Sequence, residues 1–207
     1  MIYASYRIRT SFALASLTSA ILCTGSGLQA TGENHSVCFD VNSAPSARAI
    51  ACTQIINAYE TSNKDRLSAY FNRGAANYLA GDFDNAIQDY SKVISGEPDN
   101  AAAFYERGLA YLKASQLRLA ISDFNDAIRI NPNYVSAYNN RGLAYAKANQ
   151  KALSDFNIAI QLDPSYATAL YNRSIIGLAN ADYDSAISDL KKAIQIQPYN
   201  QDLYNQL

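Results

Sequence analysis

The chain has 207 residues, of which 17 are basic and 18 acidic, so its net charge is −1. A charge near zero provides no basic surface for a phosphate backbone, which argues against nucleic acid as a ligand. Apolar residues make up 49% of the chain, too many for a wholly disordered protein. His35 is the only histidine, so a catalytic triad or a histidine-rich metal site lacks members, and we predict no catalytic residue, metal or cofactor.

The first 30 residues predict a secretory signal peptide. Arg7 and Arg9 are their only charged residues and precede an apolar stretch at 11–23, after which small and turn residues lead to Ala30. The stretch is shorter than the roughly 20 residues of a membrane-spanning helix. We predict cleavage after Ala30, no membrane span in the mature chain, and a bacterial protein that is periplasmic or secreted. A lipoprotein anchor at Cys23 and an uncleaved start of a cytosolic protein are the alternatives.

Residues 31–66 are predicted to form an N-terminal capping segment. Cleavage would leave two cysteines, Cys38 and Cys52, and an even pair in an exported chain indicates a disulfide. The loop of about 15 residues that it closes is worth roughly 3 kcal/mol in the chain-entropy model. Two free buried thiols are the alternative. Within the segment, residues 46–59 have the apolar pattern of a single helix.

The rest of the chain contains an internal repeat. Four of the five prolines follow one another at intervals of 34, 32 and 34 residues: Pro98, Pro132, Pro164 and Pro198. Alignment on them gives a column of small residues: Gly74, Gly108, Gly142 and Ser174. Further on come a column of alanines and a column of large apolar residues: Ala86, Ala120, Ala152 and Ala186, then Tyr90, Phe124, Phe156 and Leu190. Each unit predicts two helices that cross closely at the small residues, the second ended by proline.

These columns resemble the tetratricopeptide repeat, a 34-residue helix-turn-helix unit. The resemblance implies an all-α, right-handed α-solenoid of antiparallel helix pairs. It places repeats at 67–100, 101–134, 135–166 and 167–200, the third of them two residues short around 149–151. Residues 46–59 would then be an N-terminal half repeat, and 201–207 a truncated C-terminal cap.

Two charged columns run through all four units. An arginine precedes each small residue: Arg73, Arg107, Arg141 and Arg173. An aspartate precedes each large apolar residue of the second helix: Asp89, Asp123, Asp155 and Asp189. Antiparallel helices would bring the two columns to similar heights, so we predict structural Arg–Asp ion pairs. Treated as partly exposed, each is worth about 0–1 kcal/mol.

A further polar column consists of Asn72, Glu106, Asn140 and Asn172. The resemblance implies that first helices line a concave groove in which such side chains contact ligand, together with their neighbours Phe71, Tyr105, Asn139 and Tyr171. Amides suit an extended peptide because they can both donate to and accept from its backbone. Solvated polar residues without a ligand are the alternative.

The predicted function is that of a non-enzymatic, exported scaffold that binds an extended peptide or partner protein along the concave face. The alternative is a homo-oligomeric assembly module of the cell envelope that stacks through its terminal helices. An enzyme is disfavoured because no nucleophile–base pair, phosphate loop or metal spacing is present. The fold does not identify the partner.

Overall fold

The computed structural model describes residues 26–150 and 152–198, and its regular secondary structure there is entirely α-helical. The helices are α1 (Ser26–Phe39), α2 (Pro45–Asn57), α3 (Asn63–Leu79), α4 (Phe83–Gly96), α5 (Ala101–Lys113), α6 (Leu117–Ile130), α7 (Val135–Lys147), α8 (Leu153–Leu162), α9 (Ala167–Ala179) and α10 (Tyr183–Ile196). The predicted signal peptide up to residue 25 and the predicted cap at 201–207 lie outside the described residues. The predicted cleavage bond after Ala30 falls within α1.

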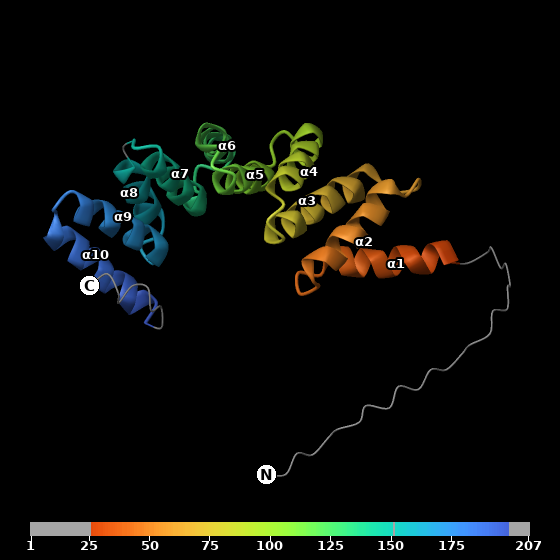
Figure 1. The fold of residues 1–207 in the computed structure, drawn as a ribbon, viewed down its shortest axis with the longest axis horizontal. Coiled ribbons are helices and arrows are strands. Elements are labelled where there is room, and N and C mark those ends of the chain that lie inside the picture. Colours follow the sequence, from red (N-terminus) through yellow and green to blue (C-terminus); the bar gives the residue numbers. More distant parts are fainter. Residues whose placement is uncertain (1–25, 151, 199–207) are drawn as a thin grey trace, which may run out of the picture.

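The helices form consecutive antiparallel pairs that follow one another in an arc (Figure 1). The second helix of each pair packs against the first helix of the next. Consecutive first helices (α3, α5, α7 and α9) also contact each other, and within the described residues no comparable contact joins consecutive second helices. The first helices therefore line the inner side of the arc, and the predicted all-α solenoid is confirmed.

The ends of the helices follow from local sequence. The second helices α4, α6, α8 and α10 each end two residues before a proline, whose ring cannot sit inside a helix. Asp82 caps the start of α4 by accepting a hydrogen bond from the backbone N–H of Asn85 at 3.2 Å. Asn100 caps α5 in the same way, accepting from Ala103 N–H at 2.9 Å.

The column of small residues lets the two helices of each pair approach closely. A Cβ atom added to Gly108 would lie 2.8 Å from the ring of Phe124, and one added to Gly142 would lie 2.8 Å from the ring of Phe156. At Gly74 the same atom would lie 3.0 Å from the ring of Tyr90. Because these distances are shorter than van der Waals contact, a larger residue would force the helices apart. The predicted packing role of this column is confirmed.

The third unit is short because its second helix has lost a turn. Helix α8 has 10 residues, whereas α6 has 14. The connection before it, residues 148–152, is longer than the corresponding connection at 114–116. The chain therefore absorbs the two missing residues at the start of α8, and Ala152 and Asp155 keep their buried positions.

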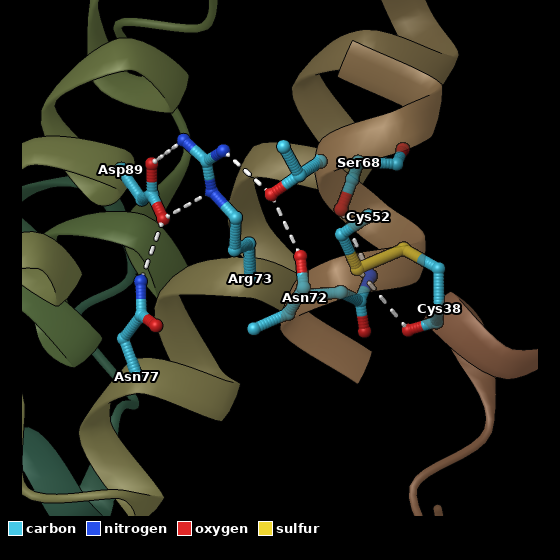
Figure 2. Close-up of a disulfide and its surroundings, with 9 residues drawn as sticks. Cys38, Cys52, Ser68, Asn72, Arg73, Asn77 and Asp89 are labelled. Atoms are coloured by element: carbon cyan, nitrogen blue, oxygen red, sulfur yellow. Dashed lines mark hydrogen bonds and ion pairs between the residues drawn. A yellow bond between two sulfur atoms is a disulfide. The ribbon is translucent and has the colours of Figure 1, made fainter. Parts of the chain in front are cut away.

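The N-terminal segment differs from the predicted half repeat because α1 completes a helix pair with α2. The sequence did not predict α1, which is largely polar. The structure contains the Cys38–Cys52 disulfide, which joins the two helices with their Cα atoms 4.9 Å apart (Figure 2). Both cysteines are fully buried and pack with Ile55 and Ile56 of α2 and with Ala69 of α3. The pair covers the exposed side of α3.

Candidate functional site

One polar side chain from each first helix forms a row that we call the inner column: Asn72, Glu106, Asn140 and Asn172. All four are half-buried. They come from α3, α5, α7 and α9, the helices that contact each other along the inner side of the arc. The structure thus brings these predicted residues to neighbouring positions on one face.

Two members of the inner column form hydrogen bonds between consecutive first helices. Asn140 Nδ2 donates to the hydroxyl of Tyr105 at 2.9 Å and to the backbone carbonyl of Ser136 at 3.0 Å. Asn172 Nδ2 donates to Oδ1 of Asn139 at 2.9 Å. Asn140 has used both amide protons, so only its Oδ1 remains available, as an acceptor. Asn140 can therefore accept a hydrogen bond from a peptide backbone but cannot also donate one, although the sequence pattern predicted both for these amides.

The other two members form no such bond. Asn72 Nδ2 donates to Ser68 O of its own helix at 2.9 Å. In the α3–α5 pair, Phe71 occupies the position that Tyr105 and Asn139 have in the later units, and a phenyl ring offers no hydrogen-bond acceptor of that kind. No hydrogen bond or ion pair to the Glu106 carboxylate is formed by any group in the described residues.

Burial raises the pKa of Glu106 above its ordinary value. Burial, and after it the charge of Glu106, also raises the pKa of Tyr134 to about 12 and that of Tyr78 above its ordinary value. These tyrosines precede α7 and lie in α3, respectively. The carboxylate thus lies within electrostatic reach of both neighbouring units.

The predicted flanking residues divide into three groups. Phe71 and Tyr105 are half-buried, and their rings pack on the second helices, 5.5 Å from Tyr90 and 5.9 Å from Phe124 between centroids. Tyr171 is half-buried against the apolar cluster of the fourth unit. Asn139 is only 2% exposed and accepts the bond from Asn172, so in this structure it supports the inner column and offers no surface to a ligand.

Each arginine of the charged columns donates to both carboxylate oxygens of its aspartate. Arg73 binds Asp89 at 2.9 and 2.7 Å, and Arg107 binds Asp123 at 2.7 and 2.8 Å. The pairs Arg141–Asp155 and Arg173–Asp189 have the same geometry, with their shortest distances at 2.7 Å. These hydrogen bonds raise the pKa of all four arginines above its ordinary value.

The expected strength of these pairs has to be corrected. The aspartate side chains are 5 to 10% exposed, so they are buried carboxylates and not the partly exposed groups we assumed. Removal of the partner of a buried charge destabilises a protein by about 3–5 kcal/mol, because the remaining charge is left without compensation. The four pairs therefore matter much more for stability than about 0–1 kcal/mol each.

A third column, which the sequence did not predict, accepts one further hydrogen bond from each arginine. Arg73 Nη1 donates to Thr53 Oγ1 at 3.0 Å, which links α3 to α2 of the preceding pair. The other arginines do the same, and the acceptors are Ser91, Asn125 and Asn157 at 2.7 to 2.9 Å. Each arginine therefore links three helices. The sequence could have revealed this column, because a polar residue directly follows the large apolar residue of the second helix in each of the first three units.

A cavity of about 470 Å³ that is open to solvent lies beside one of these pairs, between α2, α3 and α4. Ile50, Gln54, Asn85 and Gln88 line it, along with the Arg73–Asp89 pair. It is a second place where a ligand could contact the chain. Within the described residues, no group of three or more His, Cys, Asp or Glu side chains lies close enough together to hold a metal ion.

Comparison with known protein families gives matches to repeat models over most of the solenoid. A family described as "TPR repeat" matches residues 77–115 and 113–149, and one described as "Tetratricopeptide repeat" matches residues 148–201. The chain belongs to the tetratricopeptide repeat family. Repeats of this family form scaffolds for binding proteins or peptides. No curated protein matches the chain.

Solved structures show the same fold. A MamA fragment from Desulfovibrio magneticus RS-1 has 20% identity and a TM-score of 0.72, over 86% of this chain and 98% of that one. A tetratricopeptide repeat protein from Parabacteroides merdae also has 20% identity and a TM-score of 0.72, over 86% and 71%. YrrB, described as a TPR protein with an unusual peptide-binding site, has 25% identity and a TM-score of 0.62, over 75% and 81%.

No helix in the part of the chain that the structure describes is long and apolar enough to cross a membrane. This finding concerns α1 to α10 and does not extend to residues 1–25 of the predicted signal peptide.

Proposed function

We propose that this chain is a non-enzymatic scaffold that binds an extended peptide, or an extended segment of a partner protein, along the inner face of α3, α5, α7 and α9. The observation that carries the proposal is the unequal use of polar groups on the two sides of the first helices. The arginines and aspartates between the helices have their hydrogen bonds formed within the fold. The inner column keeps unused capacity at Asn140 Oδ1, at Asn72 and at Glu106.

The spacing of the inner column supports an extended ligand. Packed helices lie about 8–10 Å apart, and an extended chain advances about 3.3 Å per residue. A peptide that crosses the first helices would therefore meet a new member of the inner column about every three residues. YrrB, which has the same fold, is itself described as having a peptide-binding site.

A selection with random peptides tests the proposal. Random peptides of about 12 residues, about 40 Å long when extended, are selected for binding to the full chain. The affinity of the selected peptides is then measured by fluorescence anisotropy. We expect Asn72→Ala to weaken binding, since the amide of Asn72 lies on the inner face. Gln88→Ala is the matched amide control, because Gln88 is exposed on α4 and lines the outer cavity.

The reverse pattern, loss of binding in Gln88→Ala with full binding in Asn72→Ala, would move the ligand to the outer cavity and contradict the proposal. Failure of the wild-type chain to select any peptide would contradict it entirely.

We further propose that the chain is exported. The positively charged start with its apolar stretch supports export, and so does the buried Cys38–Cys52 disulfide, because such bonds persist in oxidising compartments. N-terminal sequencing of the protein from fractionated cells tests this. Periplasmic or secreted protein that begins near residue 31 is the expected result, and an intact N-terminus in the cytoplasm would contradict it.

Self-assembly through the terminal helices is the second candidate. The helix that a stacked copy would present to α10 is α1, and α1 contains no arginine that could bridge the two copies. The last described unit also has Lys191, an exposed cation, where the earlier units have the acceptors Ser91, Asn125 and Asn157. Light scattering at two protein concentrations separates the candidates: a constant monomer mass fits the peptide scaffold, and a mass that rises with concentration fits assembly.

A further inference from the structure

The second unit differs from the third and fourth at one place in the groove. Where α7 and α9 have Asn140 and Asn172, α5 has Glu106. The preceding first helix, α3, has Phe71 at the position where Tyr105 and Asn139 accept hydrogen bonds in the later units. The bond between consecutive first helices is therefore missing here. What stands in its place is a half-buried carboxylate without a partner in the described residues.

The core beneath this position differs as well. Tyr90 stands in the column of large apolar residues where the next two units have Phe124 and Phe156. Its side chain is 0% exposed, and its hydroxyl has no hydrogen-bond partner among the described groups. A buried hydroxyl without a partner is destabilising, so it calls for a specific explanation.

Tyr90 and Glu106 are electrostatic neighbours. After burial, the charge of Glu106 is the largest contribution that raises the pKa of Tyr90. The Tyr90 ring lies against Gly74 and Phe71, so it occupies the interior of the same unit boundary that Glu106 borders. One unit boundary thus holds two polar groups, an anion and a hydroxyl, whose bonding capacity the fold leaves unused.

No cation within the described chain compensates this carboxylate. Arg107, its neighbour in sequence, donates all its short hydrogen bonds to Asp123 and Ser91. A carboxylate that is partly withdrawn from water is destabilised in its charged form. A cation supplied from outside would remove this penalty, whereas a neutral donor would form a hydrogen bond and leave the charge.

We propose that Glu106 forms an acidic subsite of the groove that receives a lysine or arginine side chain of the bound peptide. This inference rests on the proposed function. The carboxylate would pair with the cation through a charge-assisted hydrogen bond.

The subsite should also respond to pH. Tyr78 of α3, Tyr90 of α4, Tyr105 of α5 and Tyr134 all have raised pKa values and stay neutral at acidic pH. Arg48 and Asp89 also act on Tyr90, and Asp89 is paired with Arg73. Glu106 is then the group of this cluster that loses its charge as pH falls, so affinity for basic peptides should fall with it.

The test repeats the peptide selection on three full-length chains: wild type, Glu106→Gln and Glu60→Gln. Glu60 is an exposed carboxylate before α3, so its substitution changes the net charge equally and leaves the groove intact. We expect the wild-type and Glu60→Gln chains to select peptides with a lysine or arginine at a fixed position. Glu106→Gln should lose this preference. Peptides selected on the wild-type chain should bind the Glu106→Gln chain at least about tenfold more weakly than they bind wild type.

Two contrary results are distinguishable. If the wild-type chain selects peptides without a fixed basic residue, or if Glu106→Gln keeps the preference, the acidic subsite is overturned and the peptide scaffold stands. If the wild-type chain selects no peptide at all, both are overturned. Circular dichroism of each variant establishes that it is folded.

Discussion

Two sets of polar side chains run along the solenoid, and they differ in how completely the fold uses them. The bridging arginines (Arg73, Arg107, Arg141 and Arg173) reach a buried aspartate in their own unit and a polar side chain in the preceding one. In the inner column, Asn140 is largely used and Glu106 is not used at all. We infer that polar groups bonded within the fold hold the repeats in register, and we propose that unused hydrogen-bonding capacity in the inner column serves a ligand.

The largest effect is expected from breaking a bridge. Arg107→Met leaves Asp123, whose side chain is 6% exposed, as a buried charge without its partner. We expect the free energy of unfolding to fall by about 3–5 kcal/mol. Urea denaturation followed by circular dichroism measures it.

The control for that variant is Arg129→Met. Arg129 pairs with Asp126 at 3.2 Å on the surface, with side chains 63% and 37% exposed. Its loss should change stability by less than about 1 kcal/mol. Equal effects of the two substitutions would show that the bridges are no stronger than surface pairs.

The N-terminal helix pair has no bridging arginine, and the Cys38–Cys52 disulfide links its two helices instead. Ala51-Cys52-Thr53 of α2 aligns with Asp89-Tyr90-Ser91 of α4, so an alanine replaces the aspartate and Cys52 links α2 to α1 instead. Replacement of both cysteines by alanine should lower stability by about 3 kcal/mol. The same urea experiment measures it, and an unchanged midpoint would contradict the linking role.

A substitution in the column of small residues should cause a smaller loss of stability. The Cβ of Gly108→Ala would lie 2.8 Å from the Phe124 ring, and such overpacking reduces stability by about 1–3 kcal/mol. In Gly32→Ala the added atom meets nothing within 4 Å, so the helix propensity of alanine should raise stability by about 0.5–1 kcal/mol. Thermal unfolding compares them, and a stabilised Gly108→Ala chain would refute the close crossing.

The smallest effect is expected at Glu106, and its sign is the informative part. The pKa of Glu106 is raised in the folded chain, so its contribution to stability is fully present below the unfolded pKa and is lost as pH rises through the folded one. Glu106→Gln should therefore be as stable as wild type, or more stable, by up to about 1 kcal/mol near neutral pH. The advantage should shrink as pH falls through the folded pKa towards the unfolded value of about 4.3. A clear loss of stability at neutral pH would mean that the carboxylate has a structural partner.

The repeat units, the buried small columns and the facing of arginine and aspartate were predictable, because each recurs at a fixed position in every unit. Features that occur only once in the chain could not be predicted from the sequence. The polar sequence of α1 gives no helical apolar pattern, and the shortening of α8 shows only as two missing residues. The burial of Asn139 and the isolation of Glu106 depend on contacts between units, since each is decided by the residue on the neighbouring helix.

The most direct test of the account is to locate a bound peptide. A selected peptide that carries a photoreactive group is crosslinked to the full chain, and the modified residues are identified by mass spectrometry. We expect the crosslinks to fall on α3, α5, α7 and α9, with Asn72 and Glu106 among the nearest positions. Crosslinks confined to α4, α6 and α8, or to the cavity beside Gln88, would contradict the assignment of the inner column as the binding surface.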